Sequence, residues 1–279
     1  MPEPIDLPDV FLLPLVMRNL RTSHQQPGDQ ADGLRRMFAS QRPRVIAVAS
    51  NPNVAFAGVL LERLTTACAS LGYKSLVIDA AESAPAGDEL ALVDLSACIE
   101  PLSTDVAYLA ARGLPLRHVD ARGSCVAFLQ AAADAAPWAQ LLVVHAPASE
   151  LSRLVGPRAL RPLLMAADHP TSVTQAYAAM KLLASRNGLM SYDLLLCCEP
   201  HSPRRERIAP QLADTADRFL GAVLHDWAVV DPASDVHDLP SPELLRLAHG
   251  LVRADDDAPG LLPGALPAAA RPLAATHRV

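Results

Sequence analysis

The feature that most constrains this chain is the alternation of short apolar segments with longer helix-like segments between residues 44 and 253. The apolar segments are about as long as buried strands. The segments between them carry apolar residues at helical spacing and signals for helix boundaries. Strands that alternate with helices predict parallel β-α-β units. We therefore predict an α/β fold with a three-layer, doubly wound, mostly parallel sheet.

The individual elements can be placed from the same pattern. The predicted strands cover 45–49, 76–79, 141–144, 163–167 and 192–197, and the predicted helices cover 56–71, 123–135, 171–184, 205–220 and a last stretch that begins at Pro242. Gly72 is expected to close the first helix, Thr171 to cap the helix over 171–184, and Ser241 to cap the last one.

Charge and composition narrow the class of function. Lys and Arg number 24 against 30 Asp and Glu, a formal net charge of −6, which argues against a nucleic-acid partner held by a broad basic surface. Hydrophobic residues make up 51% of the chain, enough to bury a core.

Five cysteines without a paired framework favour a reducing compartment. No apolar run reaches membrane-spanning length and no basic secretory start is present, so we expect a cytoplasmic protein.

Proline content and charge divide the chain into four parts. Residues 1–28 carry five prolines and are expected to form a flexible arm. Residues 29–40 are expected to form a short helix and 44–253 the α/β domain. Residues 254–279, which contain a run of three aspartates followed by an Ala/Pro-rich stretch, are expected to be disordered.

Ligands of parallel sheets bind at the carboxyl ends of strands, so the residues that follow each strand are the first candidates for a site. The loop after the first strand, residues 50–58, reads SNPNVAFAG and opens a helix. The second strand ends at Asp79, and the third leads into His145. We expect His145 to be a core histidine whose hydrogen bonds are satisfied, rather than a catalytic group.

These strand ends and their neighbours resemble the ParA/MinD group of deviant P-loop ATPases, and more closely its flagellar-number branch, FlhG (also called FleN). Residues 76–79 fall where that family has its LLLDAD strand. Residues 168–183, DHPTSVTQAYAAMKLL, are similar to the family's TPEPTSLTDAYALIKLL, and ADRFLG at 216–221 is similar to its AERFLG. The resemblance covers about residues 29–252 and implies a MinD-like P-loop NTPase fold.

The loop departs from the family at the positions that carry phosphate chemistry. The family reads SGKGGVGKT after the first strand, and Ser50 matches its first residue. Pro52 lies at the signature lysine, Ala57 at the phosphate lysine and Gly58 at the hydroxyl that binds Mg²⁺. Pro52 also removes a backbone N–H donor. The residues that would cradle and neutralise a triphosphate are therefore degenerate.

The ends of the other two strands also depart from the family at residues linked to phosphate and Mg²⁺ chemistry. Asp79 keeps the first acid of the family's DxD motif, but Ala81 replaces the second. His145 replaces the aspartate that the family links to Mg²⁺. Cys197 and Cys198 are adjacent on a strand, point to opposite faces and do not suit one metal ion. We expect no cofactor and no metal, with ATP and Mg²⁺ bound only if the degenerate loop still holds them.

The segment just before the first strand reads DQADGLRRMF and resembles the DQAxxLR helix of FlhG proteins. Asp29 can cap a short helix, and Leu34 and Phe38 are spaced to anchor it in a groove. In that family the helix binds FlhF, a signal-recognition-type GTPase, and stimulates GTP hydrolysis. The resemblance assigns the stimulating side chain to Gln30 and a further partner contact to Arg35.

We therefore predict a regulator of flagellar number or placement of the FlhG type, which acts on an FlhF-like GTPase without hydrolysing ATP. Other flagellar basal-body proteins are further expected partners. Recruitment to the cell pole or membrane would come from a partner, since we expect no direct membrane binding. One alternative is an ATP-switched ATPase of the MinD/ParA type. Another is a pseudo-ATPase scaffold in a different polar or cellulose-secretion system.

Overall fold

The computed structural model describes residues 42–156, 160–235 and 237–253. The predicted arm, the predicted helix at 29–40 and the predicted tail lie outside the described residues. In chain order, the strands and α-helices are β1 (Arg44–Ala49), α2 (Ala57–Ser70), β2 (Ser75–Asp79), β3 (Glu100–Pro101), β4 (Val106–Ala110), α3 (Val126–Ala135), β5 (Leu141–Ala146), α4 (Ala148–Leu154), β6 (Leu163–Ala167), α5 (Pro170–Asn187), β7 (Ser191–Cys197), α6 (Arg205–Leu220), β8 (Val223–Val230) and α7 (Pro242–Arg253).

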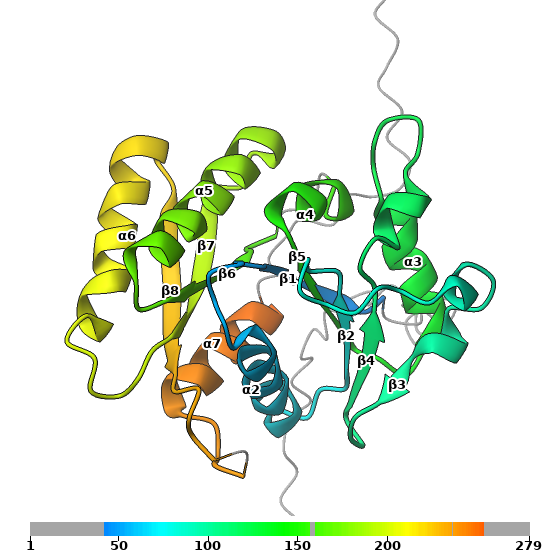
Figure 1. The fold of residues 1–279 in the computed structure, drawn as a ribbon, viewed down its shortest axis with the longest axis horizontal. Helices are drawn as coiled ribbons and strands as arrows, with labels where there is room; N and C mark the ends of the chain where they lie inside the picture. Colours follow the sequence, from blue (N-terminus) through cyan, green and yellow to red (C-terminus); the bar gives the residue numbers. More distant parts are fainter. Residues whose placement is uncertain (1–41, 157–159, 236, 254–279) are drawn as a thin grey trace, which may run out of the picture. The chain divides into compact units, whose positions relative to one another are not determined.

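The described strands form one eight-stranded sheet with the order β3-β4-β2-β5-β1-β6-β7-β8 (Figure 1). Each neighbouring pair is parallel except β3 with β4, which is antiparallel. Parallel neighbours require crossover connections, and helices supply these on both faces of the sheet. The predicted α/β fold with a three-layer, doubly wound, mostly parallel sheet is confirmed.

Two apolar layers hold the helices to the sheet. On one face, α2 and α7 pack on the sheet; on the other face lie α3, α4, α5 and α6 (Figure 1). Ile46 and Val48 of β1 face the first layer, and Ala47 and Ala49 face the second, as the alternation along a strand requires. The principal helix residues are Leu60, Leu64, Leu247 and Leu251 on the first face and Phe128, Leu151, Met180 and Leu212 on the second.

The adjacent cysteines follow the same alternation. Cys197 belongs to the layer under α2 and α7, whereas Cys198 belongs to the opposite layer. This confirms that the two thiols point to different faces. Among the described residues, no group of three or more His, Cys, Asp or Glu side chains is placed to hold a metal ion.

Most predicted elements are present with bounds shifted by a few residues, but β3, β4, β8 and α4 were not predicted. Strands β4 and β8 lie toward the edges of the sheet, where buried and partly exposed residues alternate. His225 and Asp226 interrupt the apolar run of β8. A search for continuous apolar runs finds the central strands and misses such edge strands.

The start of α5 corrects one prediction. The capping residue is His169 rather than Thr171: its backbone is extended, and its side chain accepts a hydrogen bond from the Ser172 N–H at 3.3 Å. Pro170 then occupies the first helical position, where its fixed φ and missing N–H do no harm. The last helix begins as predicted, because Ser241 Oγ accepts from the Leu244 N–H at 3.2 Å.

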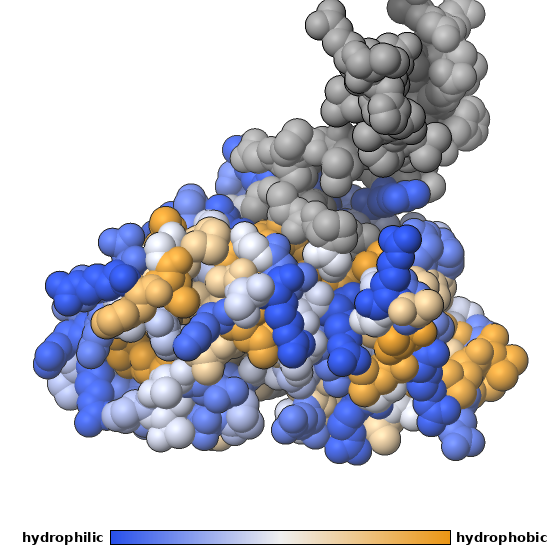
Figure 2. Space-filling view, turned by 90° about the horizontal axis from the view of Figure 1, so that it is seen from above, coloured by the Kyte–Doolittle hydropathy of each residue, from blue (hydrophilic) through white to orange (hydrophobic). Residues whose placement is uncertain are grey.

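Exposed apolar side chains gather at the amino ends of β7 and β8. Met190, Phe219 and Val223 are exposed there, and the Val223 N–H donates to the Met190 carbonyl at 2.8 Å. On the face shown in Figure 2, hydrophobic areas are separated by hydrophilic ones. No helix in the described part of the chain is both long and apolar enough to cross a membrane.

A buried ion pair lies close to the amino end of β7. Asp193 is fully buried, and the Arg161 Nε donates to its Oδ2 at 2.5 Å. The exposed His225 places Nδ1 at 3.7 Å from the other carboxylate oxygen. Burial raises the pKa of Asp193 to about 6, and the positive charge of Arg161 offsets that effect only in part.

We predict that Asp193 gives the protein a specific pH dependence of stability. Its folded-state pKa lies above the ordinary value of 3.8, so the folded chain holds this proton more tightly than the unfolded chain. The stability from this group is therefore full below about pH 4, falls as the pH rises to about 6, and is constant above that, a change of about 3 kcal/mol. Asp193→Asn, which mimics the protonated acid, should lose this decline in urea denaturation at pH 4 and pH 7.

The exposed Asp214→Asn serves as the matched control and should keep the wild-type pH dependence. If Asp193→Asn keeps it as well, the buried carboxyl does not titrate in this range.

Candidate functional site

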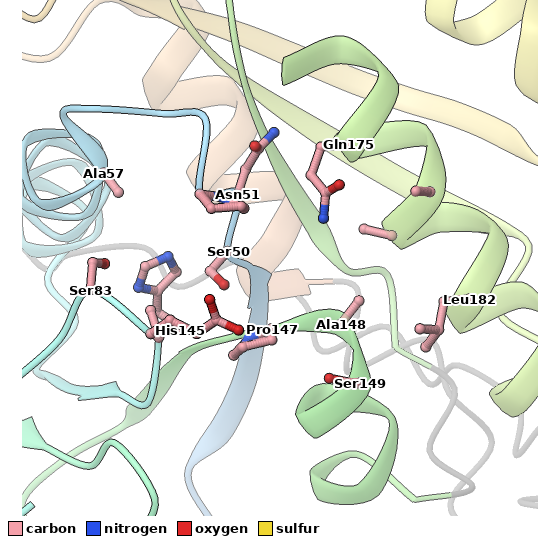
Figure 3. A pocket seen from close by; sticks show the side chains of 15 residues that line it. Ser50, Asn51, Ala57, Ser83, His145, Pro147, Ala148, Ser149, Gln175 and Leu182 are labelled. Atoms are coloured by element: carbon pink, nitrogen blue, oxygen red, sulfur yellow. The ribbon is translucent and has the colours of Figure 1, made fainter. Parts of the chain in front are cut away.

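The carboxyl ends of β2, β5 and β1 lie side by side in the sheet, and a cavity of about 340 Å³ opens beyond them. The loop after β1, the start of α4 and one side of α5 complete its walls (Figure 3). Its polar lining comes from Ser50, Asn51, Glu82, Ser83, His145, Ser149 and Gln175. The described lining contains no lysine or arginine.

The loop between β1 and α2 is anchored by the buried side chain of Asn51. Its Nδ2 donates to the Met165 carbonyl at 2.8 Å and to the carbonyl and hydroxyl of Ser172 at 2.9 and 3.1 Å. These acceptors belong to β6 and the first turn of α5. The contacts fix the loop to a neighbouring strand–helix connection.

A second contact joins the same two segments. His169 Nδ1 accepts from the Ser172 N–H, so the ring proton is on Nε2, which donates to the Asn53 carbonyl at 2.9 Å. The loop is therefore held through its side chain at Asn51 and through its backbone at Asn53.

The backbone donors of the loop are turned inward. The Asn53 N–H donates to Asn51 Oδ1 at 3.0 Å, and the Val54 N–H donates to the Asn51 carbonyl at 3.0 Å. Pro52 has no N–H at all. A phosphate cradle needs successive N–H groups that are free and point to one centre. Positions 52–54 of this loop offer none.

His145 and Asp79 form a hydrogen-bonded pair across β5 and β2. The two residues are direct neighbours in the parallel register, and His145 Nδ1 lies 2.8 Å from Asp79 Oδ1. The other oxygen of Asp79 accepts from the Tyr108 hydroxyl at 3.3 Å. Burial, together with the negative charge of Asp79, raises the pKa of Tyr108 to about 12. Tyr108 therefore acts as a donor that helps to orient the carboxylate.

The remaining nitrogen of His145 corrects the expectation of a satisfied core histidine. His145 is only 1% exposed, yet its Nε2 has no hydrogen-bond partner. In Figure 3 the imidazole lies between Ser83 and Ser50, beneath the segment that runs from Asn51 to Ala57 at the start of α2. A buried polar atom without a partner beside a cavity indicates a place for a ligand or a water molecule.

The structure brings together four of the six residues assigned to the degenerate loop and strand ends. Ser50, Pro52, Ala57 and His145 all line the cavity. Asp79 stands behind His145 as its hydrogen-bond partner, and Gly58 lies one residue further into α2. The residues proposed for partner binding, Asp29, Gln30, Leu34, Arg35 and Phe38, lie outside the described residues.

Asn51 and Gln175 were not predicted as site residues. Asn51 lies where the resembled family has a glycine, so the sequence indicated only that this glycine is missing. The tertiary contacts of the Asn51 side chain cannot be read from the spacing of residues along the chain. Gln175 sits on α5 and points into the cavity (Figure 3). It was visible in the sequence only as part of a helix match.

Several solved structures have a fold similar to that of this chain. McdA from Cyanothece in complex with ATP superposes with a TM-score of 0.53 at 10% identity, covering 77% of this chain and 96% of that one. Cobyrinic acid a,c-diamide synthase from Mycobacterium smegmatis with ADP and magnesium gives 0.52 at 16%, covering 79% and 100%. A putative plasmid partition protein from Borrelia burgdorferi B31 bound to AMPPNP gives 0.51 at 12%, covering 76% and 98%.

No family model matches the chain, and no curated protein is similar to it in sequence. At these identities the structural likeness shows the fold alone. That fold is the α/β architecture with a mostly parallel sheet that these three nucleotide-bound proteins share.

We predict that Asn51→Ala destabilises the protein by about 2–3 kcal/mol, because it leaves the buried acceptors at Met165 and Ser172 without their donor. Urea denaturation measures the loss. Asn53→Ala is the matched control in the same loop: its backbone keeps both contacts, so its effect should stay below about 0.5 kcal/mol. Equal stability of the two variants would show that the Asn51 anchor is not a significant constraint.

Proposed function

We propose that this chain is a non-hydrolysing regulator built on a ParA/MinD-type fold, which acts through protein contacts rather than through a nucleotide cycle. The observation that carries the proposal is the loop between β1 and α2. Its N–H groups at Asn53 and Val54 are occupied within the loop, and its anchor residue is buried against Met165 and Ser172. These two N–H groups can bind a phosphate only if their bonds within the loop are broken.

The charge at the site supports the same proposal. A triphosphate with Mg²⁺ is held in P-loop enzymes by a lysine, a Ser or Thr hydroxyl and an acidic residue near the metal. Ala57, Gly58 and His145 occupy the corresponding positions here. The cavity wall instead offers Glu82, whose charge would repel phosphate oxygens.

The finer proposal is a role of the FlhG type. The support is the DQADGLR sequence ahead of β1 and the similarity of the α5 sequence to that branch. In this proposal the segment from Asp29 to Phe38 docks on an FlhF-like, signal-recognition-type GTPase, and Gln30 reaches toward the partner's catalytic centre. The α/β domain holds or localises the helix, and contacts with other flagellar basal-body proteins or recruitment to the pole follow from its partners.

An ATP-switched ATPase of the MinD/ParA type is the second candidate, and the fold favours it. The two candidates differ in their response to nucleotide. A pseudo-ATPase scaffold in another polar or cellulose-secretion system would share the loop chemistry and differ in its partner.

We predict that Mg·ATP does not bind at physiological, millimolar concentration in a calorimetric titration, because Ala57, Gly58 and His145 replace the phosphate and Mg²⁺ ligands and the N–H groups of Asn53 and Val54 are already occupied. Light scattering should give the same mass with and without ATP, since Pro52 cannot supply the lysine that reaches across a nucleotide-driven dimer. A micromolar Kd, or a doubling of mass with ATP, would favour the ATP-switched candidate.

We also predict that Gln30→Ala in the full chain leaves binding to an FlhF-like GTPase within about twofold, because Leu34 and Phe38 supply the apolar anchors. The same change should reduce stimulation of GTP hydrolysis by roughly tenfold or more, because a glutamine amide can orient the attacking water. Leu34→Asp should abolish binding and stimulation together. The measurement is the GTPase rate of the partner against the concentration of each variant.

Asp214→Ala, a change at an exposed position of α6, is the control and should behave as wild type. A wild-type chain that neither binds nor accelerates such a GTPase would rule out the FlhG-type role and leave the scaffold in another system as the candidate.

A further inference from the structure

We propose that a groove beside β8 binds an acidic segment of a partner protein in extended conformation. The groove measures about 780 Å³ and is lined by the start of α6, the carboxyl-terminal half of β8 and the first turns of α7. We call it the β8 groove, and the lining residues central to it are Arg205, Arg207, Trp227, Val229 and Arg246. This site belongs to the α/β domain alone and is independent of nucleotide and of the segment from Asp29 to Phe38.

The floor of the β8 groove is an open edge of the sheet. β8 is the last strand in the order of the described sheet, with α6 packed on one face and α7 on the other (Figure 1). The Val230 carbonyl accepts from the Cys198 N–H on the β7 side. Because successive residues of a strand turn their main-chain groups to opposite sides, those of Trp227 and Val229 face away from β7.

The two outward-facing positions differ in how their main-chain groups are used. The Trp227 N–H donates to Asp226 Oδ1 at 2.7 Å, and its carbonyl accepts from Arg246 Nη2 at 3.2 Å. Two further bonds from Arg246 to the Asp226 carboxylate hold the guanidinium in place. No described residue bonds in this way to Val229. Val229 therefore leaves one donor and one acceptor for a residue of an added extended chain.

The wall formed by α6 carries positive charge that the protein does not compensate. Arg204, Arg205 and Arg207 stand at the start of this helix, the end at which the helix dipole favours acids. Glu206 is the one acidic residue in that turn, so three positive charges face one negative charge. None of the three arginines forms a salt bridge with a described residue. Carboxylates of a ligand would balance this excess.

The wall formed by α7 has no such excess. Arg246 is paired with Asp226, and Glu243 interacts electrostatically with the same guanidinium. The side chains of an extended peptide alternate between the two faces of the sheet that it joins, so one set would lie toward α6 and the other toward α7. The two walls therefore favour a peptide with carboxylates at every second position and uncharged side chains between them.

Shape and overall charge favour a peptide over other anionic partners. The arginines line a groove between two helices, which an extended chain can enter and a flat membrane surface cannot. The whole chain has a formal net charge of −6, so a nucleic acid or an anionic membrane that reaches beyond the groove meets repulsion. Pro200, Pro203 and Trp227 add apolar surface for the uncharged side chains of a peptide.

The test is the binding of a fluorescein-labelled Val-Glu-Val-Glu-Val amide to the full chain, measured by fluorescence anisotropy at low and high ionic strength. It should bind at least about tenfold more tightly than Val-Lys-Val-Lys-Val, and salt should weaken the binding. The double variant Arg205→Ala/Arg207→Ala should weaken it by about tenfold. Arg218→Ala, at the exposed far end of the same helix, is the matched control and should stay within about twofold of wild type.

Hydrogen exchange of the Val229 amide in the wild-type chain tests the strand contact without any variant. The exchange should slow when the acidic peptide binds, because the peptide supplies an acceptor for the outward Val229 N–H. Unchanged exchange with the peptide bound would overturn the pairing with β8.

Other occupants of the β8 groove have their own outcomes. No binding of the acidic peptide, equal binding of the two peptides, or binding unchanged in Arg205→Ala/Arg207→Ala would overturn the acidic-peptide site. Binding to phosphatidylglycerol vesicles that this variant loses, without peptide binding, would assign the arginines to a membrane and overturn the choice of a peptide. A dimer in light scattering that the same variant dissociates would assign the groove to a second copy of the chain instead.

Discussion

The buried side chain of Asn51 is the contact on which the carboxyl edge of the sheet depends. It joins the end of β1 to β6 and to the first turn of α5 through three hydrogen bonds, and its Oδ1 accepts from the Asn53 N–H. The backbone carbonyl of Asn51 accepts from the Val54 N–H. In a phosphate-binding loop the ligand would be the centre on which these donors converge. Here the side-chain oxygen and the backbone carbonyl of Asn51 accept these two hydrogen bonds, so the loop has a defined shape without a ligand.

The packing of the fold does not depend on a nucleotide. The sheet is held by two apolar layers in which residues such as Leu60, Leu142 and Leu164 are fully or almost fully buried, and none of this packing needs a nucleotide. The polar residues at the carboxyl ends of the strands can therefore differ without loss of the fold. Asp79 orients His145 by a hydrogen bond, so an imidazole–carboxylate pair joins the ends of β2 and β5.

The fold was predictable because its signals are local. The central strands are continuous apolar runs, and Gly72 or Ser241 mark helix ends by rules of backbone geometry. For the site, the sequence predicted only which residues of a phosphate-binding loop are absent. The anchoring role of Asn51 and the bond from His169 to the Asn53 carbonyl join segments more than a hundred residues apart, and the unpartnered nitrogen of His145 depends on neighbouring strands. Spacing along the chain does not encode such contacts.

The bonds of the Asn53 and Val54 N–H groups to Asn51 close the loop after β1 on itself. Hydrogen exchange of the Asn53 and Val54 amides tests it most directly, measured in the full chain with and without Mg·ATP. We expect both amides to be protected in the free protein, because each donates within the loop, and to be unaffected by nucleotide. Rapid exchange in the free protein that becomes slow when Mg·ATP is added would contradict the account.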